Sequence, residues 1–278
     1  MDDQSWVVDN LQNALNTWND KLGEIWSLLT ISPQEFKGGG VWGIVSGINS
    51  ALLPVAYGLL VLFFAAGVCR AAGSLTEIKR PEHALKLFVR FALAKAAVTY
   101  GMELMTAFFS IAQGIVGSII GYSGVSGLNG TELPQALIDT INDVGFWQSI
   151  PLWAVTLLGS LFITVMSFIM IMTVYGRFFR LFMYTAIAPV PLSSFAGDST
   201  SNVGKSFLRS YVGVCLEGAI IALACIIYSA IASGSPAVAG GSAVTAVWSY
   251  VGELVFSQLI LVGAIKGSDR IIKEMMGL

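Results

Sequence analysis

Four charged residues fall inside stretches that are otherwise apolar, and they are the first candidates for chemistry in this sequence. They are Lys95, Glu103, Glu217 and Glu253. A charge in the middle of a membrane costs at least about 2.5 to 3.5 kcal/mol, so such a side chain must face protein or water. One interpretation is a polar lining of a conduit, or coupling to an ion, and the alternative is pairing between helices. Lys95 also lies close enough to a boundary to extend its ammonium group into water.

Residue patterns typical of catalysis or metal binding are weak. His83 is the single histidine and has no cysteine near it, and the three cysteines lie in or beside apolar stretches. The sequence Gly-Lys-Ser at 204–206 resembles the end of a phosphate-binding loop, but Ser199 stands where that pattern requires glycine. We therefore expect no enzyme activity, no cofactor and no metal site.

The elements that position these residues are predicted from composition and hydropathy. Of the chain, 55% is hydrophobic and only 12% is charged, whereas a soluble domain carries roughly 25% charged residues. Lipid must therefore cover most of the surface, which predicts an all-α polytopic membrane protein with about five transmembrane helices. The expected spans are 42–69, 91–122, 150–175, 211–232 and 243–265.

The placement of basic residues predicts the orientation of these spans. All Lys and Arg residues except Lys21 and Lys37 lie in segments that would face one side, and the loops 123–149 and 233–242 contain none. Because cytoplasmic loops carry the excess of Lys and Arg, we predict an outside N-terminus and a cytoplasmic C-terminus. The expected domains are an extracytoplasmic tail, 1–41, and a transmembrane domain, 42–278.

Two further segments do not fit a simple span. Apolar residues recur in the tail at steps of three and four, which predicts an amphipathic helix lying on the outer membrane surface or packed on a partner. Residues 181–196 are apolar but contain Pro189 and Pro191, which would leave backbone groups unpaired in lipid. We interpret 181–196 as a re-entrant or interfacial segment.

One short motif carries a resemblance to a known family. The chain reads RFFRL at 177–181 and AIAPVPL at 186–192, directly after the third expected span. This arrangement resembles the TrbL-type polytopic inner-membrane subunits of type IV secretion and conjugation machines. The resemblance extends to the overall plan of an outside tail, about five spans and an inside C-terminus.

The resemblance implies a role in a bacterial cytoplasmic membrane. Such subunits are thought to form a homo-oligomeric channel or platform that moves a DNA-protein substrate or a protein, with energy from separate ATPases and with other secretion-system membrane proteins as partners. On this hypothesis Arg80, Lys86, Arg177 and Arg180 would contact the ATPases or the substrate. The alternative for each of these basic residues is contact with anionic lipid.

Two other functions remain open at the level of sequence. A permease for a small solute or an ion would explain the glutamates in the spans, although the inverted repeats of many transporters are not visible. A holin-like, membrane-perturbing protein is the third hypothesis, but 278 residues is long for that class. Neighbouring genes for secretion ATPases and a coupling protein would favour the secretion subunit.

Overall fold

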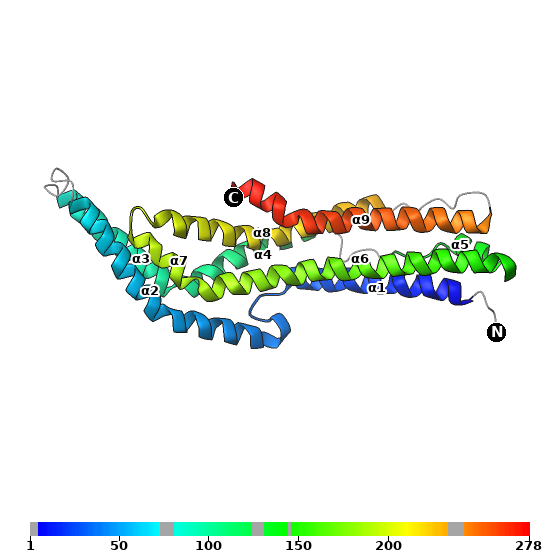
Figure 1. Ribbon diagram of the computed structural model, residues 1–278, viewed down its shortest axis with the longest axis horizontal. Helices are drawn as coiled ribbons and strands as arrows, with labels where there is room; N and C mark the ends of the chain where they lie inside the picture. Colours follow the sequence, from blue (N-terminus) through cyan, green and yellow to red (C-terminus); the bar gives the residue numbers. More distant parts are fainter. Residues whose placement is uncertain (1–4, 73–80, 124–130, 144–145, 233–241) are drawn as a thin grey trace. The chain divides into compact units, whose positions relative to one another are not determined.

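The structure is a computed structural model and describes residues 5–72, 81–123, 131–143, 146–232 and 242–278. These residues form helices and turns and contain no strand (Figure 1). The longer helices are α1 (Ser5–Thr30), α2 (Gly40–Ala72), α3 (Pro81–Thr99), α4 (Gly101–Ser123), α6 (Phe146–Ile187), α8 (Ser201–Ala232) and α9 (Ala243–Met276). The shorter elements are η1 (Phe36–Gly39), α5 (Gln135–Asn142), α7 (Pro189–Ser193) and η2 (Ser194–Ala196).

Among the described residues, five helical stretches are long and apolar enough to cross a membrane, which confirms the predicted all-α, polytopic class. They are Phe36–Arg70, Gly101–Tyr122, Ile150–Ile187, Ser201–Ala230 and Val244–Met276. Which end of each helix faces the cytoplasm stays a prediction from the basic residues. The structure also shows that three of these helices continue well past the ends expected from hydropathy.

The second expected span, 91–122, is divided at Tyr100 between α3 and α4. Hydrogen bonds still cross the division, because the Tyr100 N–H donates to the Ala96 carbonyl and the Leu104 N–H donates to the Tyr100 carbonyl. Gly101 follows, and a Cβ at this position would lie 3.0 Å from Cδ1 of Leu192 in α7. The missing side chain of Gly101 thus leaves room for a buried leucine at the division.

The chain folds as two compact units, each assembled from distant segments. Unit 1 contains Met1–Thr30, Val116–Gly176 and Ala219–Ser268, and unit 2 contains Ile31–Ile115, Arg177–Gly218 and Asp269–Leu278. Helices α4, α6, α8 and α9 contribute to both units, since each runs across a boundary between these ranges.

Unit 1 is built around α1, the predicted amphipathic helix. Its apolar face is 2% exposed or less at every position of the stripe, which comprises Val7, Leu11, Leu15, Trp18, Leu22, Ile25 and Leu29. Trp18 meets Tyr228 of α8 with 6.4 Å between ring centroids, and Trp6 meets Trp153 of α6 at 5.9 Å. The expectation that this face lies on lipid or on a partner therefore needs correction, because the same chain covers it.

Unit 2 begins with a tight turn between α1 and α2. Lys37, Gly38 and Gly39 all have positive φ angles, of 48°, 72° and 80°. Glycine adopts this left-handed region without steric cost, whereas a lysine there is uncommon. Next to the turn, the Phe36 ring stacks on Phe178 of α6 with 4.4 Å between centroids. This aromatic contact holds the start of α2 against α6.

Candidate functional site

One of the four charged residues predicted to do chemistry, Glu217, lies in unit 2 in a network that joins three helices. Glu217 of α8 is 1% exposed, and both of its carboxylate oxygens accept hydrogen bonds of 2.7 Å from Nη2 of Arg180 in α6. Nη1 of Arg180 donates to Asp269 of α9 at 2.5 Å, and Asp269 also accepts from Lys273 at 2.7 Å. Glu217 thus makes the interhelical pair that was one of its two interpretations, and its role as a lining residue stays a prediction.

A second arginine lies beside this network and is more deeply buried. Arg177 is 2% exposed, and its guanidinium carbon lies 5.0 Å from the centroid of the Phe178 ring. Its Nη1 lies 1.7 Å from where a Cβ of Gly218 would stand, so the arginine occupies the space that glycine leaves on α8. Its Nε and Nη2 have no hydrogen-bond partner within the described part of the protein.

The prediction that Arg177 and Arg180 contact partners can be compared with where the two side chains lie. The third expected span ended at residue 175, but α6 continues as one helix to Ile187. Arg177 consequently points into the protein, where a partner could not reach its guanidinium in this conformation. Arg180 is partly exposed, with 30% of its side-chain surface accessible, but it already binds two carboxylates.

A buried asparagine satisfies the backbone where the prolines interrupt α6. In a helix the carbonyl of Thr185 would accept from the N–H of residue 189, but Pro189 has no N–H. Nδ2 of Asn49 in α2 donates to that carbonyl at 2.7 Å, and Asn49 is 4% exposed. The unpaired backbone group expected from the prolines is thus paired by a neighbouring helix, as apolar surroundings require. Whether 181–196 is re-entrant or interfacial in a membrane stays a prediction.

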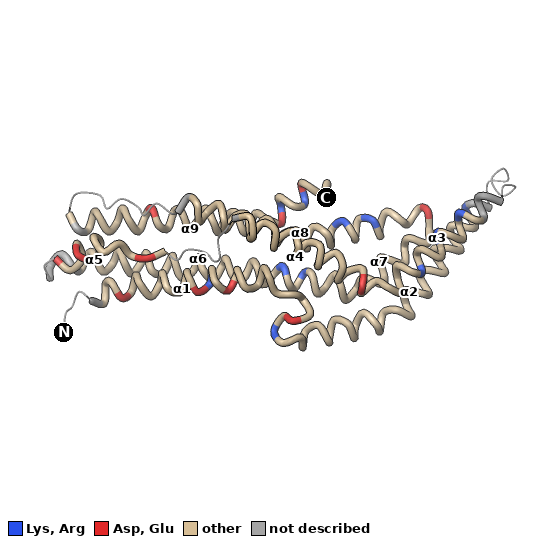
Figure 2. The backbone as a smooth tube through the Cα atoms, turned by 180° about the vertical axis from the view of Figure 1, so that it is seen from behind, with Lys and Arg blue, Asp and Glu red and all other residues tan. Residues whose placement is uncertain are grey.

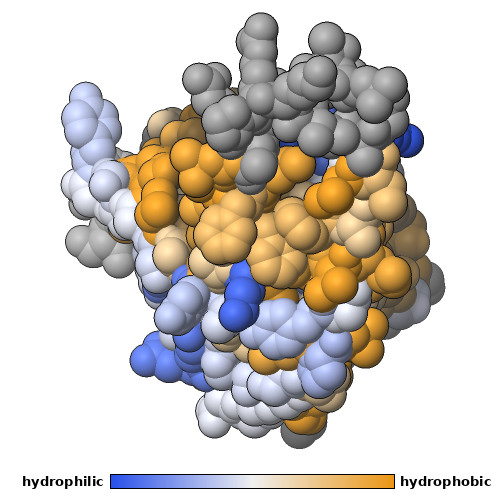
Figure 3. Space-filling model, turned by 90° about the vertical axis from the view of Figure 1, so that its left-hand side faces the viewer, coloured by the Kyte–Doolittle hydropathy of each residue, from blue (hydrophilic) through white to orange (hydrophobic). Residues whose placement is uncertain are grey.

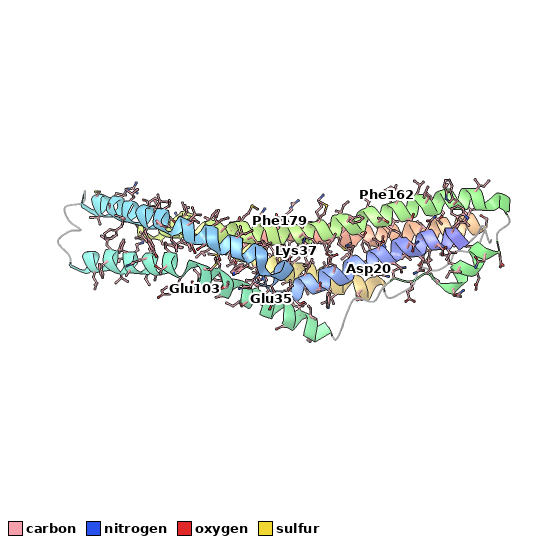
Figure 4. The ribbon with its side chains drawn as sticks, turned by 90° about the horizontal axis from the view of Figure 1, so that it is seen from below. Asp20, Glu35, Lys37, Glu103, Phe162 and Phe179 are labelled. Carbon is pink, nitrogen blue, oxygen red and sulfur yellow. The ribbon has the colours of Figure 1, made fainter. Side chains whose placement is uncertain are left out.

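The other three charges in apolar stretches lie on the surface of the chain. Lys95 of α3, Glu103 of α4 and Glu253 of α9 are exposed, and none of them takes part in an ion pair between described residues. Figure 4 shows Glu103 on the outward side of its helix. Lys95, Glu103 and Glu217 belong to unit 2, and Glu253 belongs to unit 1. That these residues line a conduit stays a prediction.

The remaining predicted partner contacts lie near the start of α3. Lys86 is exposed on this helix, and Arg80 lies outside the described residues. One turn after Lys86, Arg90 forms an ion pair with Asp198 and donates from Nε to the Phe195 carbonyl at 3.2 Å. The hydrogen bond from Arg90 lowers the pKa of Asp198 below its ordinary value.

Sequence reasoning missed Asn49, Gly218 and Asp269. Asn49 is a polar residue in an otherwise apolar helix and could have been noticed as a partner for a proline-interrupted segment. Gly218 directly follows the buried Glu217, and small residues in a span permit close approach of a neighbour. Asp269 was assigned to the C-terminal tail, where nothing indicated a partner. No group of three or more His, Cys, Asp or Glu side chains that could bind a metal occurs among the residues that the structure describes.

Five apolar helices with buried polar links between them define a polytopic α-helical membrane protein. A family model described as TrbL/VirB6 plasmid conjugal transfer like protein matches residues 18–189, which is more than half of the chain. The protein belongs to this family, as the motif at 177–192 predicted. The family is a structural component of conjugal transfer systems rather than a known enzyme family, and its members associate with the membrane and with other conjugation components. No curated protein and no solved structure gives a significant match to the chain.

Proposed function

We propose that this protein is a channel or platform subunit of a conjugative type IV secretion apparatus in a bacterial cytoplasmic membrane. It would act as a homo-oligomer beside other secretion-system membrane proteins, with separate ATPases supplying energy for transfer of a DNA-protein or protein substrate. The observation that carries the proposal is the family match over residues 18–189.

The apolar surface of the spans supports an assembly within the membrane. Large apolar side chains are widely exposed on α2 and α6, for example Ile44 at 66%, Leu62 at 64% and Phe179 at 65%. Figure 4 shows Phe162 and Phe179 projecting from α6 without a covering helix. Lipid tails or apolar helices of neighbouring subunits are the surroundings that such faces require.

The exposed charges support the presence of a surface within the same assembly that contacts water. Glu103 and Glu253 lie on helices that qualify as membrane spans and have no ion-pair partner among the described residues. Because an uncompensated charge in lipid is costly, these side chains would face water or a neighbouring subunit. On this proposal they belong to a conduit formed between copies of the chain.

Native mass spectrometry of the protein in a mild detergent tests the oligomeric part of the proposal. A defined homo-oligomer is the expected result. A monomer that supports uptake of a small solute in vesicles would instead favour the permease.

Transfer frequency tests the role in conjugation. Deletion of the gene should abolish transfer of the conjugative element, and the wild-type gene should restore it. Glu103→Gln is expected to lower transfer with unchanged protein level in the membrane, whereas Phe162→Leu on the apolar surface of α6 serves as a control expected to transfer normally. Normal transfer after the deletion would contradict the proposal.

A further inference from the structure

A cluster of basic residues in unit 2 is brought together by one ion pair. Arg90 of α3 binds Asp198, which lies just before α8, and also binds the Phe195 carbonyl in η2. This link places the exposed Lys86, one turn before Arg90, near the first turns of α8. The pKa of Asp198 is lowered first by its hydrogen bond with Arg90, and Lys86 and Lys205 add to this effect. Both lysines therefore lie within electrostatic reach of the same carboxylate.

Lys86, Lys205 and Arg209 form what we call the basic surface. Lys205 and Arg209 are four residues apart on α8 and so share one face of that helix. All three side chains are exposed, and none makes an ion pair with another described residue. Figure 2 shows basic positions on both α3 and α8.

The basic residues at the end of α9 differ from this arrangement. There, Arg270 binds Glu274 at 2.8 Å and Lys273 binds Asp269 at 2.7 Å. Most of the positive charge in that segment is thus neutralised within the helix. The basic surface has no ion pair between described residues, and the carboxylate of Asp198 beside it is held by Arg90.

Exposed apolar side chains alternate with the basic surface. On α3, Leu85 is 64% exposed, Phe88 is 65% exposed and Leu93 is 66% exposed, while Val203 of α8 is 58% exposed. Figure 3 shows hydrophilic side chains directly beside hydrophobic ones on the face it presents. Nucleic acid or a soluble acidic protein would neutralise the charges but leave these apolar side chains in water. A phospholipid has both chemistries, since its phosphate accepts from Lys and Arg and its acyl chains cover apolar side chains.

We propose that the basic surface of Lys86, Lys205 and Arg209 binds the headgroup phosphate of anionic phospholipid, with the neighbouring side chains of α3 against its acyl chains. The site couples α3 to α8 through a lipid in addition to the Arg90–Asp198 pair. The proposal depends on the membrane class of the protein and is independent of its role in conjugation.

Native mass spectrometry with added lipid tests this site on the full-length protein. The purified protein is titrated in neutral detergent with dioleoyl phosphatidylglycerol or with dioleoyl phosphatidylcholine, and retained lipids are counted. The wild type should retain phosphatidylglycerol preferentially. Each Lys or Arg near a membrane surface contributes about fivefold to such binding, so the affinity of the triple variant Lys86→Gln, Lys205→Gln, Arg209→Gln for phosphatidylglycerol should fall roughly a hundredfold.

A matched control variant removes the same number and kind of charged side chains at another place in the chain. Lys266→Gln, Arg270→Gln, Lys273→Gln also replaces two lysines and one arginine, and it should retain lipid like the wild type. Asp198→Asn breaks the ion pair that holds α3 beside the start of α8 and should also lower retention, although it removes a negative charge from the chain. Equal loss in both triple variants, or unchanged retention in the first, would overturn the proposal and assign binding to net charge alone.

Discussion

The two units of this protein are stabilised by different interactions. Unit 1 is organised around the apolar face of α1, in which Trp18 and its neighbours are almost completely buried. Unit 2 depends on polar links between distant helices, such as Asn49 to the Thr185 carbonyl and Arg180 to Glu217 and Asp269. An apolar face is visible as a repeat along the sequence, whereas a polar link needs two positions that only folding brings together. The following experiments test this contrast.

Replacing Trp18 by alanine should have the largest effect on unit 1. A buried aromatic side chain truncated to alanine costs about 3 to 5 kcal/mol, because apolar burial is lost and a cavity remains. The free energy of unfolding can be measured in mixed micelles as the fraction of sodium dodecyl sulfate increases. Trp26→Ala, at a partly exposed position on the same helix, is the control. It should lower the free energy of unfolding clearly less. Equal losses would show that the buried face of α1 does not hold unit 1 together.

Replacing Glu217 by leucine should lower the free energy of unfolding by an amount comparable to that of Trp18→Ala, here through unit 2. Removal of one member of a buried ion pair costs roughly 3 to 5 kcal/mol. Glu217 is the buried member here, and its loss leaves the partly exposed Arg180 with Asp269 alone, so the cost should lie toward the lower end of that range. The same unfolding assay measures this loss. Glu253→Leu removes an exposed glutamate in the same class of helix and is expected to leave stability unchanged or raise it. A tolerated Glu217→Leu would indicate that the network is not needed for folding.

Gly218→Ala should disturb the packing of Arg177 without changing any charge. The new Cβ would overlap Nη1 of the arginine, and such overpacking costs about 1 to 3 kcal/mol. Combining it with Arg177→Met should recover part of the loss, because the shorter side chain no longer occupies that space. Gly58→Ala is the control, since nothing lies within 4 Å of a Cβ there. An unchanged unfolding free energy in Gly218→Ala would mean that Arg177 has another position.

Asn49→Ala should lower the free energy of unfolding by about 1 to 3 kcal/mol, because the buried Thr185 carbonyl loses its hydrogen-bond donor. The double variant Asn49→Ala, Pro189→Ala offers a sharper measurement. Alanine at 189 supplies the N–H that proline lacks, so it should reduce the loss caused by Asn49→Ala. If the two changes are simply additive, the asparagine does not act through the carbonyl freed by Pro189.

Removal of the Arg90–Asp198 ion pair should change the stability of the protein least. The pKa of Asp198 is lowered in the folded protein, so the pair adds stability above the ordinary aspartate pKa of about 3.9 and loses it as pH falls below that value. Since Asp198 is 84% exposed on its side chain, solvent and salt screen most of this contribution. A pH titration of thermal unfolding should therefore change only slightly in Asp198→Asn. A large change would show that the pair is shielded from water.

Much of the fold could be predicted from the sequence, because its signals are local. The apolar stretches indicated five spans, and the repeat in residues 6–29 indicated the helix that became α1. The motif at 177–192 indicated the family that the comparison confirmed. Helix ends were less predictable. Hydropathy suggested an end near residue 175, but α6 continues to Ile187, with Arg177 packed against Gly218 and Arg180 bound to Glu217 inside unit 2.

The candidate site shows where sequence alone was insufficient. The composition established that lipid must cover the chain and that any charge in a span needs compensation, since these conclusions depend only on residue types. The sequence could not decide between lining and pairing for Glu217, because pairing requires α6, α8 and α9 to meet around it. The tertiary structure also determines that Arg177 is buried against Gly218 and that Asn49 binds the Thr185 carbonyl. These contacts join residues separated by 37 to 136 positions, and no local pattern in the chain records which distant residue will become the partner.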